Sequence, residues 1–282
     1  MNETPLLRYL QRAPFYFLVL VIATYALFPF YWAFNTSFKT ENEMFRRATY
    51  LPQEATSKNY DYVLRDGTFL QALRNSAFAS GATTVFSLMV GSFAAYALGR
   101  LRFRGRNALL YLVLSMTMFP AISILSGLYT IVREFGVFGT PMALVVTYPV
   151  FTLPFTVWVL TAFFKGLPAE IEQAAIVDGA SPFQRFRLVL LPLTAPALVT
   201  TGLLAFVTSW NEYLFALNFT ITRPASQTVT VAIAQFSGVD AMQDPIAEIM
   251  AAAMIVTIPL VILVLIFQNR IVAGLTAGAV KG

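Results

Sequence analysis

The sequence predicts an all-α membrane protein with six transmembrane helices. Of its 282 residues, 57% are hydrophobic and only 12% are charged, a balance well outside that of water-soluble domains. Six apolar runs each have roughly the 17–25 residues that a helix needs to cross about 30 Å of hydrocarbon. The runs are continuously apolar rather than alternating, which favours helices over the strands of a barrel.

The residue types that are missing exclude several functions. The chain has no Cys and no His, which excludes disulfides, thiolate metal sites and the commonest general base. We therefore expect no metal centre. The formal net charge of +5 comes from basic residues clustered beside apolar runs, which the positive-inside rule explains without nucleic acid.

The apolar runs give the order of the predicted helices. The first run follows Arg8 and Arg12 as a secretory signal would, but it ends in FNTSF without a cleavage site, so we interpret it as a retained span. No repeat or low-complexity tract interrupts the chain, which predicts one membrane domain. The six predicted spans are 15–34, 76–98, 108–131, 143–164, 195–219 and 250–267.

Basic residues beside the spans predict the orientation. Arg8 and Arg12 flank the first span, and four arginines crowd the short link 100–106 without an acid among them. Both segments are therefore expected in the cytoplasm. The external segment 35–75 also holds six basic residues, but it is long and contains five acids, so it carries less topological weight. This gives a cytoplasmic N-terminus (1–14), a membrane domain (15–267) and a cytoplasmic tail (268–282).

The segment 165–194, between the fourth and fifth spans, is predicted to fold into a short helical element at the cytoplasmic face. Pro168 suits the first turn of a helix, and Glu170 and Glu172 then lie near its positive end. A narrow face of small and apolar residues follows at helical spacing. Its members are Ile171, Ala174, Ala175 and Asp178.

A tight turn and a second helix are predicted next. Gly179 follows the last residue of the first helix, where a left-handed conformation favours Gly. Ser181, Pro182 and Gln184 then have the spacing of a capping box. A helix–turn–helix results. The alternative is an ordinary polar loop that links two spans.

The same segment carries a family resemblance. Residues 173–192 read QAAIVDGASPFQRFRLVLLP, which resembles the coupling loop of ATP-binding-cassette (ABC) importer permeases: E-A-A, three residues, G, nine residues, I-x-L-P. Gln173 replaces the first Glu of that pattern, and Glu172 precedes it. The resemblance implies a type I importer permease fold and contact with an ATPase subunit. The implied contact residues are Glu172, Gln173, Ala174, Ala175, Asp178, Gly179, Ala180, Leu191 and Pro192.

Three further segments resemble the second membrane subunit of the maltose-type sugar importers: SPFQRFRLVLLPLTAP, SWNEYLFAL and the terminal NRIVAGLTAGAVKG. The resemblance implies that the tail reaches between two ATPase subunits through Gly274, Leu275, Thr276 and Gly278. The alternative is a frayed terminus. It also implies that the segment 222–248 enters the cleft of a binding protein through Gln235, Phe236, Ser237 and Gly238. A packed or re-entrant loop is the alternative there.

Glu212 is the one acid that the predicted spans contain. A carboxylate in mid-membrane costs roughly 2.5–3.5 kcal/mol, so it should face a water-filled path or a polar partner. With Trp210 and Asn211 it forms the candidate substrate path. The alternative is that Glu212 lies near the external end and is solvated.

The predicted function is a permease subunit of an ATP-driven importer for maltose, trehalose or related oligosaccharides in a bacterial or archaeal cytoplasmic membrane. The expected partners are a second permease, an ATPase dimer, a sugar-binding protein and membrane lipid. The chain lacks a G-x-x-x-x-G-K-[ST] phosphate loop, so ATP and Mg²⁺ are expected on the ATPase and no cofactor on this chain. A permease for a glycerophosphodiester or a polyol is the alternative within transport. An intramembrane enzyme is the rival outside it, but a single Glu is insufficient for catalysis.

Overall fold

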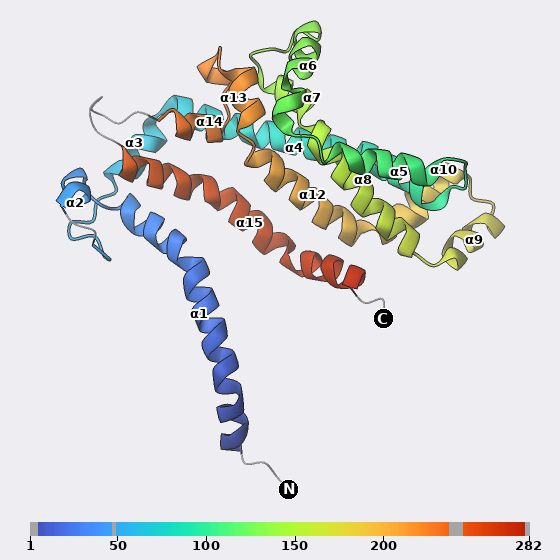
Figure 1. Ribbon diagram of the computed structural model, residues 1–282, viewed down its shortest axis with the longest axis horizontal. Coiled ribbons are helices and arrows are strands. Elements are labelled where there is room, and N and C mark those ends of the chain that lie inside the picture. The colour runs from blue at the N-terminus through green and yellow to red at the C-terminus, as the bar shows by residue number, and fades with distance from the viewer. Residues whose placement is uncertain (1–4, 47–48, 237–244, 280–282) are drawn as a thin grey trace. The chain divides into compact units, whose positions relative to one another are not determined.

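The computed structural model describes residues 5–46, 49–236 and 245–279, and the regular elements within these ranges are all helices. The chain divides into two compact units. The first comprises the residues up to Asp66 together with Phe236–Thr257, and the second comprises Gly67–Gln235 with the residues from Ile258 onward. Figure 1 labels the helices along the chain.

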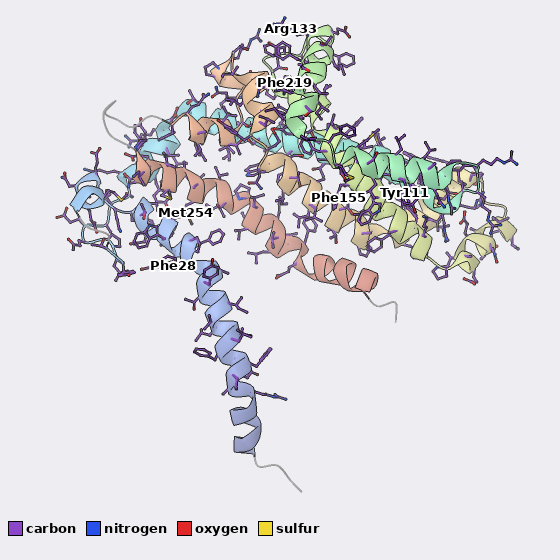
Figure 2. All side chains as sticks on the ribbon, viewed as in Figure 1. Phe28, Tyr111, Arg133, Phe155, Phe219 and Met254 are labelled. Atoms are coloured by element: carbon purple, nitrogen blue, oxygen red, sulfur yellow. The ribbon has the colours of Figure 1, made fainter. Side chains whose placement is uncertain are left out.

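In its described residues, the first unit holds three helices and the start of a fourth. These are α1 (Pro5–Ser37), α2 (Glu41–Arg46), α3 (Lys58–Arg65) and the first part of α15 (Ile246–Ala279). From Arg12 to Tyr31 every side chain of α1 is exposed, Phe28 among them (Figure 2). A helix that is apolar and exposed all round suits hydrocarbon surroundings rather than water.

Hydrogen bonds from polar side chains hold together the segment that follows α1. The Asn59 Nδ2 donates to the carbonyls of Ser37 and Lys39, at 2.9 and 3.0 Å. The Glu43 carboxylate accepts hydrogen bonds from Thr49 Oγ1 at 2.6 Å and from the Gln53 N–H at 3.0 Å. Burial raises the pKa of the Glu43 carboxyl, but these bonds outweigh it and the pKa lies below its usual value. The long segment after the first span is therefore an ordered polar structure where the structure describes it.

The second unit is a helical bundle in which α4 (Gly67–Arg100), α8 (Pro149–Gly166) and α12 (Ala195–Trp210) pack against one another (Figure 1). Hydroxyl groups and glycines line these contacts, as is common between membrane helices. Ser87 Oγ and Thr152 Oγ1 lie 2.7 Å apart across α4 and α8. The remaining elements outside residues 165–194 are α5 (Arg106–Met116), α6 (Ala121–Glu134), α7 (Pro141–Thr147), α13 (Leu214–Thr220), η2 (Pro224–Ser226) and α14 (Val229–Ala234).

Two buried apolar clusters hold this bundle, one towards each end of α4. The first includes Ala79 with residues of α6, α7, α13 and α14, among them Tyr148 beside α8 and Phe215 of α13. The second includes Tyr96 of α4 with Phe164 of α8 and Phe186. The second cluster is where residues 165–194 join the bundle.

Four described helices are long and apolar enough to cross a membrane, and two bent helix pairs bring the number to six if each pair makes one crossing. The first, second, fourth and sixth predicted spans lie within α1, α4, α7–α8 and α15. The third predicted span, 108–131, is broken into two helices. α5 and α6 meet there at 98°, because Pro120 lacks an N–H and is extended, with ψ 130°.

The fifth predicted span, 195–219, extends beyond the helix that the structure contains. α12 ends at Trp210 rather than continuing to residue 219, and α13 begins at Leu214. Asn211 and Glu212 interrupt the apolar run at this break, and the run resumes in α13. Glu212 therefore lies in the connection between two helices and not inside a span.

Candidate functional site

The candidate site is the segment 165–194, called the coupling loop below. α8 ends at Gly166, Pro168 takes the N-cap position, and α9 (Ala169–Val177) follows. The predicted helix thus exists, with Pro168 one residue before its first turn instead of within it. Glu170 and Glu172 lie in that turn, where the helix dipole favours acids.

The turn after α9 has the predicted conformation. Gly179 has φ 80°, in the left-handed region. The Ala180 N–H donates to the Ala175 carbonyl at 2.9 Å, and the Gly179 N–H donates to the Ile176 carbonyl at 3.0 Å. This pair of bonds is the Schellman motif that closes a helix end. The predicted role of Gly179 as a left-handed C′ residue is confirmed.

The second helix begins with the predicted capping box. The Gln184 N–H donates to Ser181 Oγ at 3.3 Å, and the Ser181 N–H donates to Gln184 Oε1 at 2.8 Å. The helical run that follows comprises α10 (Pro182–Gln184), the π-helix η1 (Arg185–Leu190) and α11 (Leu191–Leu193), and it meets α12 at 76°. The predicted helix–turn–helix is therefore present, and Pro192, which has no N–H, lies just beyond the widened π turns.

The tip of the coupling loop exposes apolar side chains. Val177 is 87% exposed, Phe183 56% and Ile176 52%. On the predicted small-residue face, Ala174 and Asp178 are exposed, whereas Ala175 is buried against its own chain. Val177 and Ile176 lie outside that face, so the helical spacing did not identify them. Exposed apolar patches of this kind are typical of surfaces that contact another protein or a membrane.

The inner side of the coupling loop is anchored in the bundle. Phe186 of η1 is buried, with its ring 4.7 Å from that of Phe93 and 5.2 Å from that of Tyr96. Leu190 is fully buried in the same cluster, while Leu191 is half-buried and Pro192 exposed. The coupling loop therefore has a fixed apolar base and a free apolar tip.

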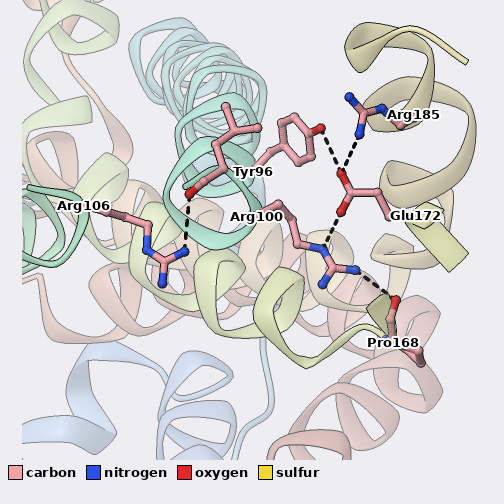
Figure 3. A network of polar contacts seen from close by, with 7 residues as sticks. Tyr96, Arg100, Arg106, Pro168, Glu172 and Arg185 are labelled. Carbon is pink, nitrogen blue, oxygen red and sulfur yellow. Dashed lines mark hydrogen bonds and ion pairs between the residues drawn. The ribbon is translucent and has the colours of Figure 1, made fainter. Parts of the chain in front are cut away.

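Ionic contacts join α9 to the bundle (Figure 3). Glu172 Oε2 lies 3.3 Å from Arg100 Nε, and Glu172 Oε1 lies 3.3 Å from Arg185 Nη1. The Tyr96 hydroxyl donates to Glu172 Oε1 at 3.4 Å. From sequence, Arg100 indicated only the topology, and Arg185 and Tyr96 carried no signal. Tyr96 and Glu172 are 76 residues apart, so no local pattern could have paired them.

The three candidate path residues have different surroundings. Trp210 is buried, with its ring 5.5 Å from that of Phe206, and Asn211 is exposed. The Glu212 carboxylate accepts hydrogen bonds from the N–H groups of Phe215 at 2.8 Å and Ala216 at 3.0 Å. Glu212 therefore caps the N-terminus of α13.

The remaining candidate residues are described in part. Gln235 Oε1 accepts a hydrogen bond from Gln227 Nε2 at 2.9 Å, and the Phe236 ring makes an edge contact with Tyr62. Ser237 and Gly238 lie outside the described residues. The backbone of Gly274, Leu275, Thr276 and Gly278 belongs to α15, which continues to Ala279.

Residues 87–276 match the family described as "Binding-protein-dependent transport system inner membrane component". The chain is 43% identical over 262 residues to the trehalose transport system permease protein SugB of Mycobacterium tuberculosis (strain CDC 1551 / Oshkosh), which covers 93% of this chain and 95% of that protein. It is 41% identical over 265 residues to the trehalose/maltose transport system permease protein MalG of Thermococcus litoralis, with 93% and 94% covered.

A solved structure supports the fold. A chain of a bacterial ABC transporter involved in the import of the acidic polysaccharide alginate matches with a TM-score of 0.78 at 22% identity, over 95% of this chain and 99% of that one. At this identity the likeness concerns the fold alone. The chain belongs to the family of binding-protein-dependent transport system inner membrane components and is a multi-pass membrane protein.

Proposed function

We propose that this chain is one of two permease subunits of an ATP-driven carbohydrate importer. Its relatives at 43% and 41% identity are named as trehalose and trehalose/maltose permeases, which supports a disaccharide-type cargo over a glycerophosphodiester or a polyol. The observation that carries the transport role is the coupling loop, with its fixed base, left-handed turn and exposed apolar tip. Both termini and this loop face the cytoplasm in the proposed orientation.

The proposed mechanism is alternating access driven by a separate ATPase dimer, which holds ATP and Mg²⁺. Val177 and Phe183 enter a cleft on one ATPase subunit, together with Ala174 and Asp178 beside them. When the ATPases close on ATP they displace the coupling loop. The bundle then opens towards a sugar delivered by an extracytoplasmic binding protein. Apolar side chains suit this docking because burying them supplies affinity without requiring a charged partner.

Two further contacts belong to the proposal. The segment 222–248 meets the binding protein, in keeping with its place between α13 and α15 on the side opposite the coupling loop in the proposed topology. The last residues of α15, from Gly274, contact the ATPase dimer. Removal of residues 274–282 should leave insertion intact and reduce the ATPase that co-purifies. Undiminished co-purification with unchanged hydrolysis would contradict the role of the tail.

The function is tested by purifying the affinity-tagged chain with the subunits that remain bound to it in its native membrane. The complex is placed in proteoliposomes with its binding protein, and the uptake of labelled trehalose and maltose is measured with and without ATP. We expect uptake that requires both ATP and the binding protein. Uptake of glycerophosphodiesters or polyols without sugar uptake would establish the other cargo class.

A further inference from the structure

Two neighbouring residues at the start of the coupling helix α9 face different surroundings. Gln173 is exposed, whereas the Glu172 side chain is only 16% exposed and points into the chain. Both Glu172 oxygens are engaged there, Oε2 by Arg100 and Oε1 by Arg185 and Tyr96 (Figure 3). Glu172 therefore serves this chain's own packing instead of presenting a charge to a partner.

The partners of Glu172 come from two other elements. Tyr96 and Arg100 lie in the last turns of α4, and Arg185 is the first residue of η1. Arg100 also donates from Nη2 to the Pro168 carbonyl at 3.1 Å, so it contacts α9 at its N-cap as well as through Glu172. One carboxylate thus joins α9, α4 and η1.

The helix α8 does not continue into α9. Leu167 and Pro168 are extended, with ψ 140° and 138°, so no continuous run of helical hydrogen bonds sets the angle between the two helices. The side chains of Arg100 and Arg185 are 10% and 17% exposed, so solvent screens their attraction to Glu172 only weakly. Without Glu172, two guanidinium groups would face each other across the junction.

We propose that Glu172 is a positioning residue that makes α9, η1 and the end of α4 one rigid body. A displacement of the exposed tip then moves α4, which packs along α8 and α12, instead of only changing the angle between α8 and α9. This inference rests on the proposed function, because it assigns the junction a part in coupling ATP hydrolysis to transport.

The test is the amount of sugar taken up per ATP hydrolysed in reconstituted complexes. For Glu172→Gln, which keeps the size and removes the charge, we expect this ratio to fall several-fold while ATP hydrolysis continues. Glu170→Gln and Arg187→Gln are the matched controls, because Glu170 and Arg187 are exposed residues of α9 and η1. A wild-type ratio in Glu172→Gln would overturn the proposal.

A double variant separates the ion pair from a general structural effect. In Glu172→Gln with Arg185→Gln one of the two facing cations is also removed, so the ratio should recover in part relative to Glu172→Gln alone. If the double variant instead has a lower ratio than Glu172→Gln alone, the ionic contact between Glu172 and Arg185 does not explain the loss. A wild-type complex without ATP-driven uptake would instead refute the proposed function, so the two failures are distinguishable.

A distance measurement keeps the proposal testable if Glu172→Gln does not assemble. The chain has no Cys, so spin labels can be placed on Ala169→Cys in α9 and Arg102→Cys after α4, both exposed positions outside the junction. With Glu172 present, the distance between the labels should be the same with and without ATP. A nucleotide-dependent change in that distance would show that α9 moves relative to α4 and would overturn the proposal.

Discussion

Gly91 of α4 lies so close to Thr156 of α8 that a Cβ atom on Gly91 would stand 2.6 Å from the Thr156 Cγ2. Thr156 is held in place, because its Oγ1 donates to the Thr152 carbonyl at 2.7 Å. Thr152 in turn pairs with Ser87 of α4. Small residues and hydroxyl groups bring membrane helices into close contact in this way, and the α4–α8 contact leaves no room for a methyl group.

Gly91→Ala should therefore destabilise the bundle. The added methyl group must push α4 and α8 apart, at a cost of about 1–3 kcal/mol. Gly81→Ala is the matched control, because among the described residues no atom lies within 4 Å of a Cβ there. In the control the better helix propensity of Ala should be neutral or stabilising. Thermal unfolding of the two variants in detergent would measure the difference, and equal melting temperatures would contradict it.

Glu212→Ala should weaken the junction between α12 and α13. The variant removes the carboxylate that accepts the Phe215 and Ala216 N–H groups, and losing such a cap costs about 0.5–2 kcal/mol. Thr230 bonds the Glu212 carbonyl at 2.8 Å, so α14 should be disturbed as well. We expect assembled complex with a lower melting temperature and altered uptake kinetics. Glu212→Gln, which keeps one acceptor oxygen, should lose less.

A transport role for Glu212 and a capping role make different predictions. If the carboxylate serves the cargo, Glu212→Ala should change the relative rates for a panel of sugars. If it serves only α13, all rates should fall together with stability. Uptake of the panel at matched stability, measured at lower temperature, separates the two. Unchanged melting and unchanged uptake would contradict both.

The local features of the coupling loop could be predicted because each depends on adjacent residues. Gly179 had to be left-handed once Asp178 ended a helix, and Ser181 with Gln184 is a capping box by spacing alone. The same holds for the existence of the long apolar helices. The positions at which these helices break were harder to predict. Pro120 gave a signal for one, whereas Asn211 and Glu212, which directly follow the end of α12 at Trp210, were interpreted as path residues within a span.

The contacts that position the coupling loop could not be predicted. Arg100 and Glu172 meet because α4 and α8 pack side by side, which brings the end of α4 close to the start of α9, and this is a property of the tertiary structure. The capping role of Glu212 was missed for a related reason. An isolated acid in an apolar run indicates a functional group, and only the helix break behind it shows which N–H groups it serves.

Val177→Asp should abolish docking of the ATPase. Val177 is 87% exposed at the tip, and placing a charge in a buried apolar interface carries a large desolvation penalty. Ala174→Glu should act similarly by adding bulk and charge beside it. Leu101→Asp, at an exposed residue away from the tip, is the control. Co-purification of the ATPase with each variant measures docking, and wild-type yields for both tip variants would refute this surface as the docking site.

The most specific prediction concerns Gly179, because its role depends on backbone conformation alone. Among the described residues no atom lies within 4 Å of a Cβ at Gly179, so a larger side chain meets no steric barrier there. The left-handed φ of 80° nevertheless costs a β-branched residue on the order of 1–2 kcal/mol. Gly179→Val should therefore redirect α10 relative to α9. The chain should insert and assemble normally while sugar uptake and the ATP hydrolysis stimulated by the binding protein both fall.

Two further substitutions are the controls for Gly179→Val. Gly166→Val adds the same side chain to the same loop, also where no described atom lies within 4 Å, but at a helical residue. Because Val has a slightly better helix propensity than Gly, this variant should fold and keep transport. Gly179→Asn places a residue that tolerates the left-handed region and should retain more activity than Gly179→Val. If all three variants transport sugar at the wild-type rate, the turn at Gly179 does not determine the direction of the coupling loop.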